Sequence, residues 1–132
     1  MVKKKLTNIK TRTYCNPDNK IEKRYEYSKL SHVLTKKINK TEKKKNGIYF
    51  TPPETIHKSL QYLEPYMKNI KEVLEPSCGS CEYILALNKK YGNIKITGIE
   101  LNKIIFESIT RFERDNIVLI NDDYLNYEFK NG

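Results

Sequence analysis

After Pro65 the chain alternates between short apolar runs and segments whose apolar residues recur with helical spacing. The apolar runs predict strands at 71–75, 94–99 and 117–120, and the periodic segments predict helices at 80–90 and 102–114. Strands separated by single helices usually pair in parallel, because the helix returns the chain to the same end of the sheet. The sequence therefore predicts an α/β fold built on a βαβαβ parallel sheet.

A helix start precedes this alternation at Thr-Pro-Pro-Glu, residues 51–54. Thr51 has the chemistry of an N-cap, proline suits a first helical turn, and Glu54 completes a capping box with Thr51. We expect this helix to end at Glu64-Pro65.

The N-terminal third of the chain is strongly basic. Residues 1–46 hold 15 Lys/Arg against 4 Asp/Glu, whereas residues 47–132 hold 10 against 12. We expect a mobile start with a turn at Asn16-Pro17-Asp18, then an amphipathic helix from Lys20 to Lys40. The sequence thus predicts a basic, partly disordered and helical arm over 1–46 and a domain over 47–132. Such an arm favours a polyanionic partner, although lysine-rich composition alone does not require one.

Size and composition limit the class of protein. At 132 residues the chain holds one domain with an appendage, and 38% apolar residues allow only a modest core. We expect no membrane span, since no run approaches about 18 apolar residues. The start has no secretory apolar segment, and three cysteines without an export signal suggest reduced thiols. A cytoplasmic, or more broadly intracellular or viral, setting is expected.

Cys78-Gly79-Ser80-Cys81, at the first strand-to-helix junction, allows three interpretations. A redox dithiol would sit at such a junction, but thioredoxin-like folds need a later proline, and no proline follows Pro76. A metal site would need two more ligands, and Cys15, His32 and His57 form no second paired spacing. The third interpretation is a glycine turn whose helix N-terminus faces an anionic ligand group.

Acidic residues at the next strand ends favour the third interpretation. Glu100 follows the second predicted strand, 21 residues after Gly79, and Asp122-Asp123-Tyr124 follow the third. The carboxyl ends of parallel strands meet at one crevice, where an acid at this spacing can bind ribose hydroxyls. Acids at strand ends also serve as helix caps, but three in matching positions favour a ligand site.

These motifs together resemble a known enzyme family. TPPE, VLEPSCGSCEYI, ITGIELN and NDDYL occur in the order and spacing of the S-adenosylmethionine-dependent N6-adenine DNA methyltransferases of restriction–modification systems. The resemblance covers about residues 47–127 and implies a partial Rossmann-like methyltransferase fold preceded by the basic helical arm.

The resemblance also implies which residues bind S-adenosylmethionine. These are Thr51, Pro52, Pro53, Glu75, Pro76, Ser77, Cys78, Gly79, Glu100, Leu101, Asp123 and Tyr124. The Thr-Pro-Pro segment would border the methionine part of the cofactor, and residues 75–79 would surround its methionyl end. Glu100 would hold the ribose hydroxyls, with Leu101 beside the adenine. Asp123 would accept from the adenine amino group, with Tyr124 near the ring. No metal is implied.

Two departures from the family pattern are visible. Cys81 stands where family members usually carry glycine, and its side chain would weaken cofactor binding by crowding the turn. The catalytic motif, a polar residue followed by Pro-Pro-aromatic, is absent, because the only Pro-Pro precedes Glu54. We therefore expect no catalytic residue here and an inactive chain on its own. A three-stranded sheet also predicts an open edge that a second chain would complete.

The leading hypothesis is thus the cofactor-binding part of an N6-adenine DNA methyltransferase, with DNA reached through the basic arm and the missing C-terminal portion. A methyltransferase for RNA or protein is an alternative, because the cofactor motifs are shared. A non-catalytic nucleic-acid-binding module is a second alternative, and a dithiol redox protein a third.

Overall fold

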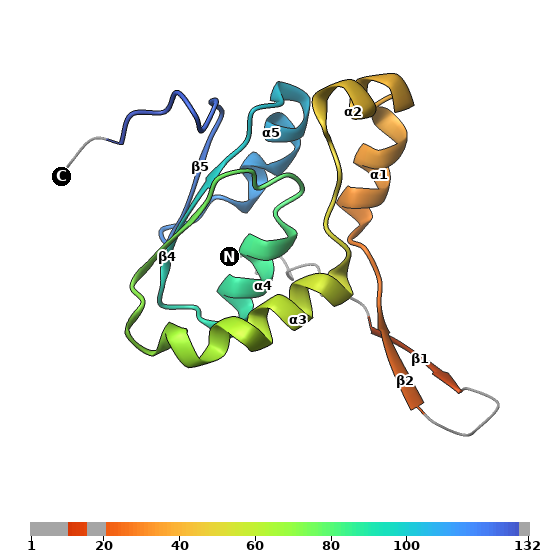
Figure 1. Ribbon diagram of the computed structural model, residues 1–132, viewed down its shortest axis with the longest axis vertical. Helices are drawn as coiled ribbons and strands as arrows, with labels where there is room; N and C mark the ends of the chain where they lie inside the picture. Colours follow the sequence, from red (N-terminus) through yellow and green to blue (C-terminus); the bar gives the residue numbers. More distant parts are fainter. Residues whose placement is uncertain (1–10, 16–20, 130–132) are drawn as a thin grey trace, which may run out of the picture.

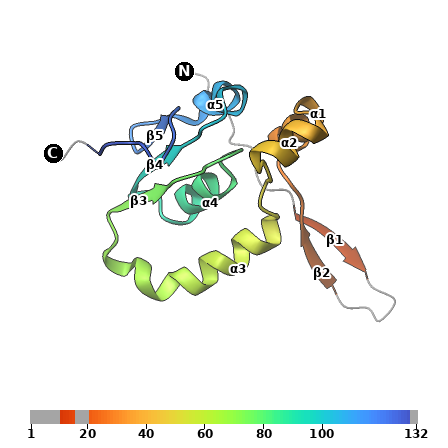
Figure 2. The same ribbon diagram turned by 45° about the horizontal axis from the view of Figure 1, so that its top comes forward.

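A three-stranded parallel sheet forms the centre of the computed structural model, which describes residues 11–15 and 21–129. Its strands lie in the order β3 (Glu72–Glu75), β4 (Lys95–Ile99) and β5 (Ile117–Ile120) (Figure 1, with β3 labelled in Figure 2). In register, Val73 of β3 lies opposite Ile96 of β4, which lies opposite Ile117 of β5. The predicted βαβαβ unit, and with it the partial Rossmann-like fold, is confirmed.

The two crossover helices are shorter than predicted. Helix α4 spans Glu82–Lys90 rather than beginning at Ser80, because Cys81 adopts the left-handed conformation, with φ 64°, that interrupts helical backbone. Helix α5 spans Lys103–Ile109 and continues as the 3₁₀ turn η2, Thr110–Phe112. Asn102 caps α5, since its side chain accepts from the Ile105 N–H at 3.1 Å.

Helix α3 covers Pro53–Leu63 and ends before Pro65, as predicted, followed by the 3₁₀ segment η1 (Glu64–Asn69). The predicted capping box is wrong. Pro52 occupies the N-cap position, and no side chain caps the helix. Pro52 itself precedes Pro53, and a residue before proline is driven towards extended backbone, so Pro52 has ψ 136° and the helix starts one residue too late for Thr51 to cap it.

The predicted helix from Lys20 to Lys40 is wrong over its first part. Strand β2 (Ile21–Tyr25) pairs antiparallel with β1 (Thr11–Cys15), and this hairpin projects from the rest of the fold (Figure 1). Helix formation begins only at α1, Lys29–Lys37. Ile21 and Tyr25 are four residues apart, a spacing that places them on one face of a helix or on one face of a strand, and pairing with β1 decides for the strand.

A second short helix follows α1 at the end of the basic segment. Helix α2 spans Lys40–Asn46, is capped by Asn39 and ends at Gly47, whose φ of 62° suits glycine. The turn expected at Asn16-Pro17-Asp18 lies outside the described residues, as does most of the start expected to be mobile.

Helix α4 lies between the sheet and α3 (Figure 2), and one apolar core joins these layers. Ile96 of β4, Ile84 of α4 and Ile56 of α3 are almost fully buried in it. Leu34 of α1 and Ile38 after it belong to the same core. The division of the chain at residue 46 stays a prediction, although α1 packs as part of the folded unit.

The opposite face of the sheet is less covered. Leu74, Thr97 and Val118 form one row across the three strands, and Leu74 and Val118 are 37% and 51% exposed. Among the described residues β3 pairs only with β4, so its other edge is open. Within the described residues no helix is long and apolar enough to cross a membrane.

Candidate functional site

The loop between β3 and α4 is fixed to the end of β4 by backbone hydrogen bonds. The Cys78 N–H donates to the Ile99 carbonyl at 2.9 Å, and the Cys81 N–H donates to the Cys78 carbonyl at 2.8 Å. Gly79 lies between them with φ 51°, a conformation that glycine adopts without strain. Gly98 of β4 contributes space, since a Cβ there would lie 2.5 Å from Cδ1 of Ile84. Glycine thus allows α4 to pack directly on the sheet.

Glu100 closes this loop from the end of β4. Its Oε2 accepts from the Gly79 N–H at 2.9 Å, and its Oε1 accepts from the Asn102 N–H at 2.7 Å. The side chain is 8% exposed. Each carboxylate oxygen has two acceptor positions, so each can still accept a hydrogen bond from a ligand hydroxyl.

The end of β5 is joined to the same centre by Asn121. Its side-chain amide donates to the Glu100 carbonyl at 2.7 Å and to the Leu101 carbonyl at 3.2 Å. Asp123 organises the turn that follows. Its carboxylate accepts hydrogen bonds from the backbone N–H of Leu125 at 3.0 Å and from the side-chain amide of Asn126 at 2.8 Å. The ends of three strands therefore form one connected rim.

Two adjoining cavities open at this rim. The larger, of about 390 Å³, has walls from the loop after β3, the ends of β4 and β5, and residues 46–50. The smaller, of about 130 Å³, lies between residues 49–51 and the start of α4. Tyr49, Phe50, Ser77 and Gly79 line both. The larger volume is within the range of small-ligand pockets.

Most of the residues predicted for the site converge on these cavities. The larger cavity is lined by Pro76, Ser77, Gly79, Glu100, Leu101, Asp123 and Tyr124. The smaller is lined by Thr51, Glu75, Ser77, Cys78 and Gly79. Pro52 and Pro53 line neither, because they form the N-terminus of α3.

Sequence reasoning missed the aromatic wall of the site. Tyr49 and Phe50 line both cavities, and Leu125 lines the larger one. Two adjacent aromatic residues just before the Thr-Pro-Pro segment were the available signal, since exposed aromatic rings commonly mark binding surfaces.

Two acids of the site are shifted towards protonation. Burial raises the pKa of Glu100, and the backbone N–H groups of Asn102 and Gly79 act against this shift. Burial also raises the pKa of Glu75, opposed by the backbone N–H of Ser77. Carboxyl groups that are buried or half-buried at a cavity, with shifted pKa values, are typical of ligand sites.

The two loop cysteines have no feature of a reactive pair. Cys78 and Cys81 are free and buried. Hydrogen bonding to Cys78 and burial raise the pKa of Cys81, which keeps its sulfur in the unreactive thiol form. The Cys81 side chain is 1% exposed and lines neither cavity. Within the described part of the chain, no group of His, Cys, Asp and Glu is arranged to hold a metal ion.

The loop and the acid fit a nucleoside-containing cofactor. An open parallel sheet binds such ligands beyond the carboxyl ends of its strands, and here a glycine turn, a buried acid and a cavity occur at that place. The fold and site together define an α/β domain with a nucleotide-type cofactor crevice.

This chain belongs to the N-6 DNA methylase family, whose pattern matches residues 22–130. The match begins well before residue 47, so the similarity extends into β2 and the N-terminal helices. Most of the residues that resemble the family's cofactor motifs line the crevice, Pro52 and Pro53 excepted.

Two viral relatives show similarity at the sequence level. Modification methylase CviBIII of Paramecium bursaria Chlorella virus NC1A is 29% identical over 103 residues, covering 76% of this chain. Type II methyltransferase M.CvrRI of Paramecium bursaria Chlorella virus XZ-6E is 30% identical over 90 residues, covering 66% of it. The chain spans only 27% and 22% of their lengths.

Two solved structures show weaker similarity. The plantazolicin methyltransferase BamL, solved with a triazolic desmethylPZN analogue and SAH, aligns with TM-score 0.45 and 21% identity over 59% of this chain and 30% of its own. The methyltransferase BpumL, solved with a pentazolic analogue and SAH, aligns with TM-score 0.47 and 14% identity over 76% and 36%.

Proposed function

We propose that this chain is the S-adenosylmethionine-binding part of an adenine-N6 DNA methyltransferase. The observation that carries the proposal is the Glu100 carboxylate, buried beside the cavity and hydrogen-bonded to Gly79 of the glycine turn. Family membership supports the choice of cofactor and of reaction class.

Each part of the rim has a proposed role towards the cofactor. Glu100 accepts hydrogen bonds from the ribose hydroxyls, and Leu101 contacts the adenine. Asp123 accepts from the adenine amino group and Tyr124 packs near the ring. The loop 75–79 and Thr51 surround the methionyl end in the smaller cavity. The bound cofactor supplies the methyl group; these residues hold and orient it.

We also propose that further polypeptide completes the enzyme. The sequence lacks the Pro-Pro-aromatic motif that holds a flipped base, and the open edge of β3 beside exposed Leu74 and Val118 fits additional strands. The names of the viral relatives support DNA as the substrate, and DNA together with free thiols supports an intracellular setting.

Calorimetric titration with S-adenosylmethionine tests the cofactor site. Wild-type protein should bind saturably, and Glu100→Ala should weaken binding at least about tenfold, since hydrogen bonds to a charged group contribute about 1.5–3 kcal/mol. Glu107→Ala is the matched control, because Glu107 is an exposed acid on α5 away from the crevice. A folded wild-type chain that does not bind the cofactor would overturn the proposal. So would equal affinity of Glu100→Ala and wild type.

A non-catalytic nucleic-acid-binding module is the second candidate. The lysine-rich helix α2 favours it, because this helix has no buried residue and carries Lys40, Lys43, Lys44 and Lys45. It predicts DNA binding by a chain that does not bind S-adenosylmethionine.

A further inference from the structure

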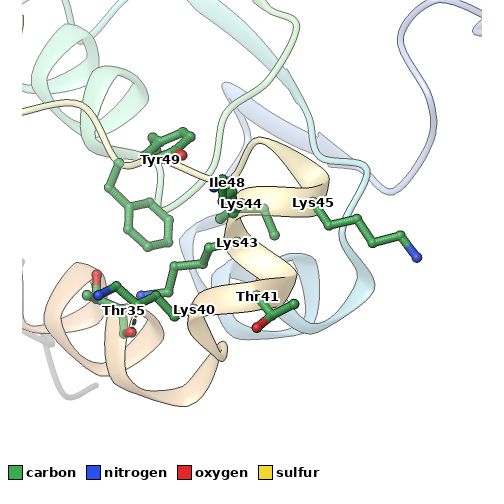
Figure 3. A pocket seen from close by; sticks show the side chains of 9 residues that line it. Thr35, Lys40, Thr41, Lys43, Lys44, Lys45, Ile48 and Tyr49 are labelled. Atoms are coloured by element: carbon green, nitrogen blue, oxygen red, sulfur yellow. Dashed lines mark hydrogen bonds between the residues drawn. The ribbon is translucent and has the colours of Figure 1, made fainter.

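A basic pocket adjoins the cofactor crevice. It has a volume of about 930 Å³ and lies along α2, between Thr35 of α1 and residues 48–50 (Figure 3). Its lining includes all four lysines of α2 together with Tyr49. This concentration of positive charge has no counterpart on the other wall of the crevice, where Glu100, Asp122 and Asp123 lie.

One lysine of this pocket has a structural role. The Lys43 ammonium group donates to the Thr35 carbonyl, which ties α2 to the end of α1 (Figure 3). The ion pairs found among the described residues involve lysines 58, 90, 95 and 103, and none of the α2 lysines. Lys40, Lys44 and Lys45 are exposed on a helix that is held in place by its neighbour.

The basic pocket and the crevice share a wall. Ile48, Tyr49 and Phe50 line both the basic pocket and the 390 Å³ cavity. The Tyr49 side chain is 78% exposed, so its ring is open to a planar partner. A polyanion bound by the lysines would therefore lie directly beside the cofactor.

We propose that this pocket binds the phosphate backbone of DNA next to the base being methylated, with Lys40, Lys44 and Lys45 contacting phosphates and Tyr49 contacting a base or sugar. Lysines meeting phosphates release condensed counterions, and aromatic rings stack on exposed bases. The choice of DNA and of a methylated base rests on the proposed function, whereas the charge arrangement does not.

The amino-acid composition of α2 argues against an anionic membrane as the partner. A helix that lies in a membrane interface buries an apolar face. Helix α2 reads Lys-Thr-Glu-Lys-Lys-Lys-Asn, without an apolar residue, and has no buried residue. Its surface suits phosphates arrayed along a strand and reached through water.

Fluorescence anisotropy with a short labelled DNA duplex, repeated over a series of salt concentrations, tests the proposal on the full chain. The test variant is K40Q/K44Q/K45Q. The control is K68Q/K71Q/K89Q, which removes the same charge from exposed lysines outside the pocket. Far-UV circular dichroism verifies that both variants fold.

The test variant should bind DNA at least about tenfold more weakly than wild type, and its slope of log K against log salt should fall by about 3. The control should change the slope by less than about 1. Tyr49→Ala should weaken binding without changing the slope. Equal losses in the two triple variants would overturn the proposal, as would binding to phosphatidylserine vesicles but not to DNA.

Titration with S-adenosylmethionine separates this proposal from the proposed function. If the wild-type chain binds the cofactor and the test variant binds DNA as tightly as wild type, the DNA-binding role of the basic pocket is overturned and the proposed function stands. If the wild-type chain does not bind the cofactor but the test variant loses DNA affinity, the DNA-binding role of the pocket is supported and the proposed cofactor-binding function is overturned.

Discussion

The Gly79 N–H donates to the Glu100 carboxylate at 2.9 Å, across 21 residues of sequence. This hydrogen bond joins the glycine turn after β3 to the end of β4, so the two halves of the candidate cofactor site are held together by a contact within the protein.

The two acids of the site whose pKa is raised should make stability depend on pH. Burial raises the pKa of Glu100 and of Glu75 above 4.5, so the folded protein holds these protons more tightly than the unfolded chain. Their stabilising contribution is present below 4.5 and is lost as pH rises through the raised folded-state pKa values. We expect the free energy of unfolding of wild type, relative to E75Q/E100Q, to fall over this interval.

Urea titrations at a series of pH values measure this difference, with Glu107→Gln as the control on the exposed face of α5. The comparison uses the pH slope, since glutamine also removes an acceptor from the Gly79 and Asn102 amides. Parallel pH profiles for wild type and the double variant would contradict the prediction.

The N-terminal helix should be coupled to the cofactor loop through Ser31. Its buried hydroxyl donates to the Glu82 carboxylate at 2.5 Å and shares a 2.8 Å hydrogen bond with Ser80. Ser31→Ala leaves Glu82, itself 5% exposed, with one donor fewer, and should reduce the free energy of unfolding by about 1–3 kcal/mol.

Ser108→Ala is the control for this change, because Ser108 donates only to the Ile104 carbonyl of its own helix. It should change stability by less than about 0.5 kcal/mol in the same urea titration. If Ser31→Ala lowered the free energy of unfolding no more than Ser108→Ala, the hydrogen bonds of Ser31 would not hold α1 to the cofactor loop.

Gly98 should tolerate no side chain. A Cβ there would lie 2.5 Å from Cδ1 of Ile84, 2.9 Å from Cδ2 of Leu119 and 3.1 Å from Cβ of Cys78. Gly98→Ala should destabilise the protein by about 1–3 kcal/mol, because these neighbours are packed in the core.

Gly92→Ala provides the comparison, since a Cβ at Gly92 meets only the Asn88 carbonyl at an ordinary 3.6 Å. Ile84→Val removes the atom nearest to the added methyl group, so Gly98→Ala should cost less in that background. Equal costs in both backgrounds would show that the strain lies elsewhere.

The protein should be less stable with alanine at position 81 than with glycine there. It is the described non-glycine residue with positive φ, 64°, and a Cβ in this conformation costs about 1–2 kcal/mol. Both substitutions remove the thiol, so their difference is the backbone strain less the packing of one buried methyl group. We expect Cys81→Gly to exceed Cys81→Ala by about 1 kcal/mol in the free energy of unfolding.

The same pair of variants examines the effect of Cys81 on the cofactor. The sequence predicted weaker binding through crowding at the turn. Because the side chain lines neither cavity, we now expect both variants to bind S-adenosylmethionine within about twofold of wild type. A large gain for glycine alone would show that the turn itself limits binding.

The sequence by itself determined the parallel sheet and the place of the crevice. Apolar runs at 72–75, 95–99 and 117–120 became strands within one residue of prediction. Once their order was fixed, parallel pairing had to bring the glycine turn, Glu100 and Asp123 to one edge. These features depend on periodicity and connectivity, which are local properties of a sequence.

Tertiary structure decided the features that depend on contacts between distant segments. Pairing with β1 made residues 21–25 a strand, and packing directed the Cys81 side chain into the core rather than the crevice. Ser31 met Glu82 across 51 residues, and Tyr49 became the wall shared by the crevice and the basic pocket. No local sequence pattern predicts these contacts between distant residues, because each contact forms only when the chain has folded.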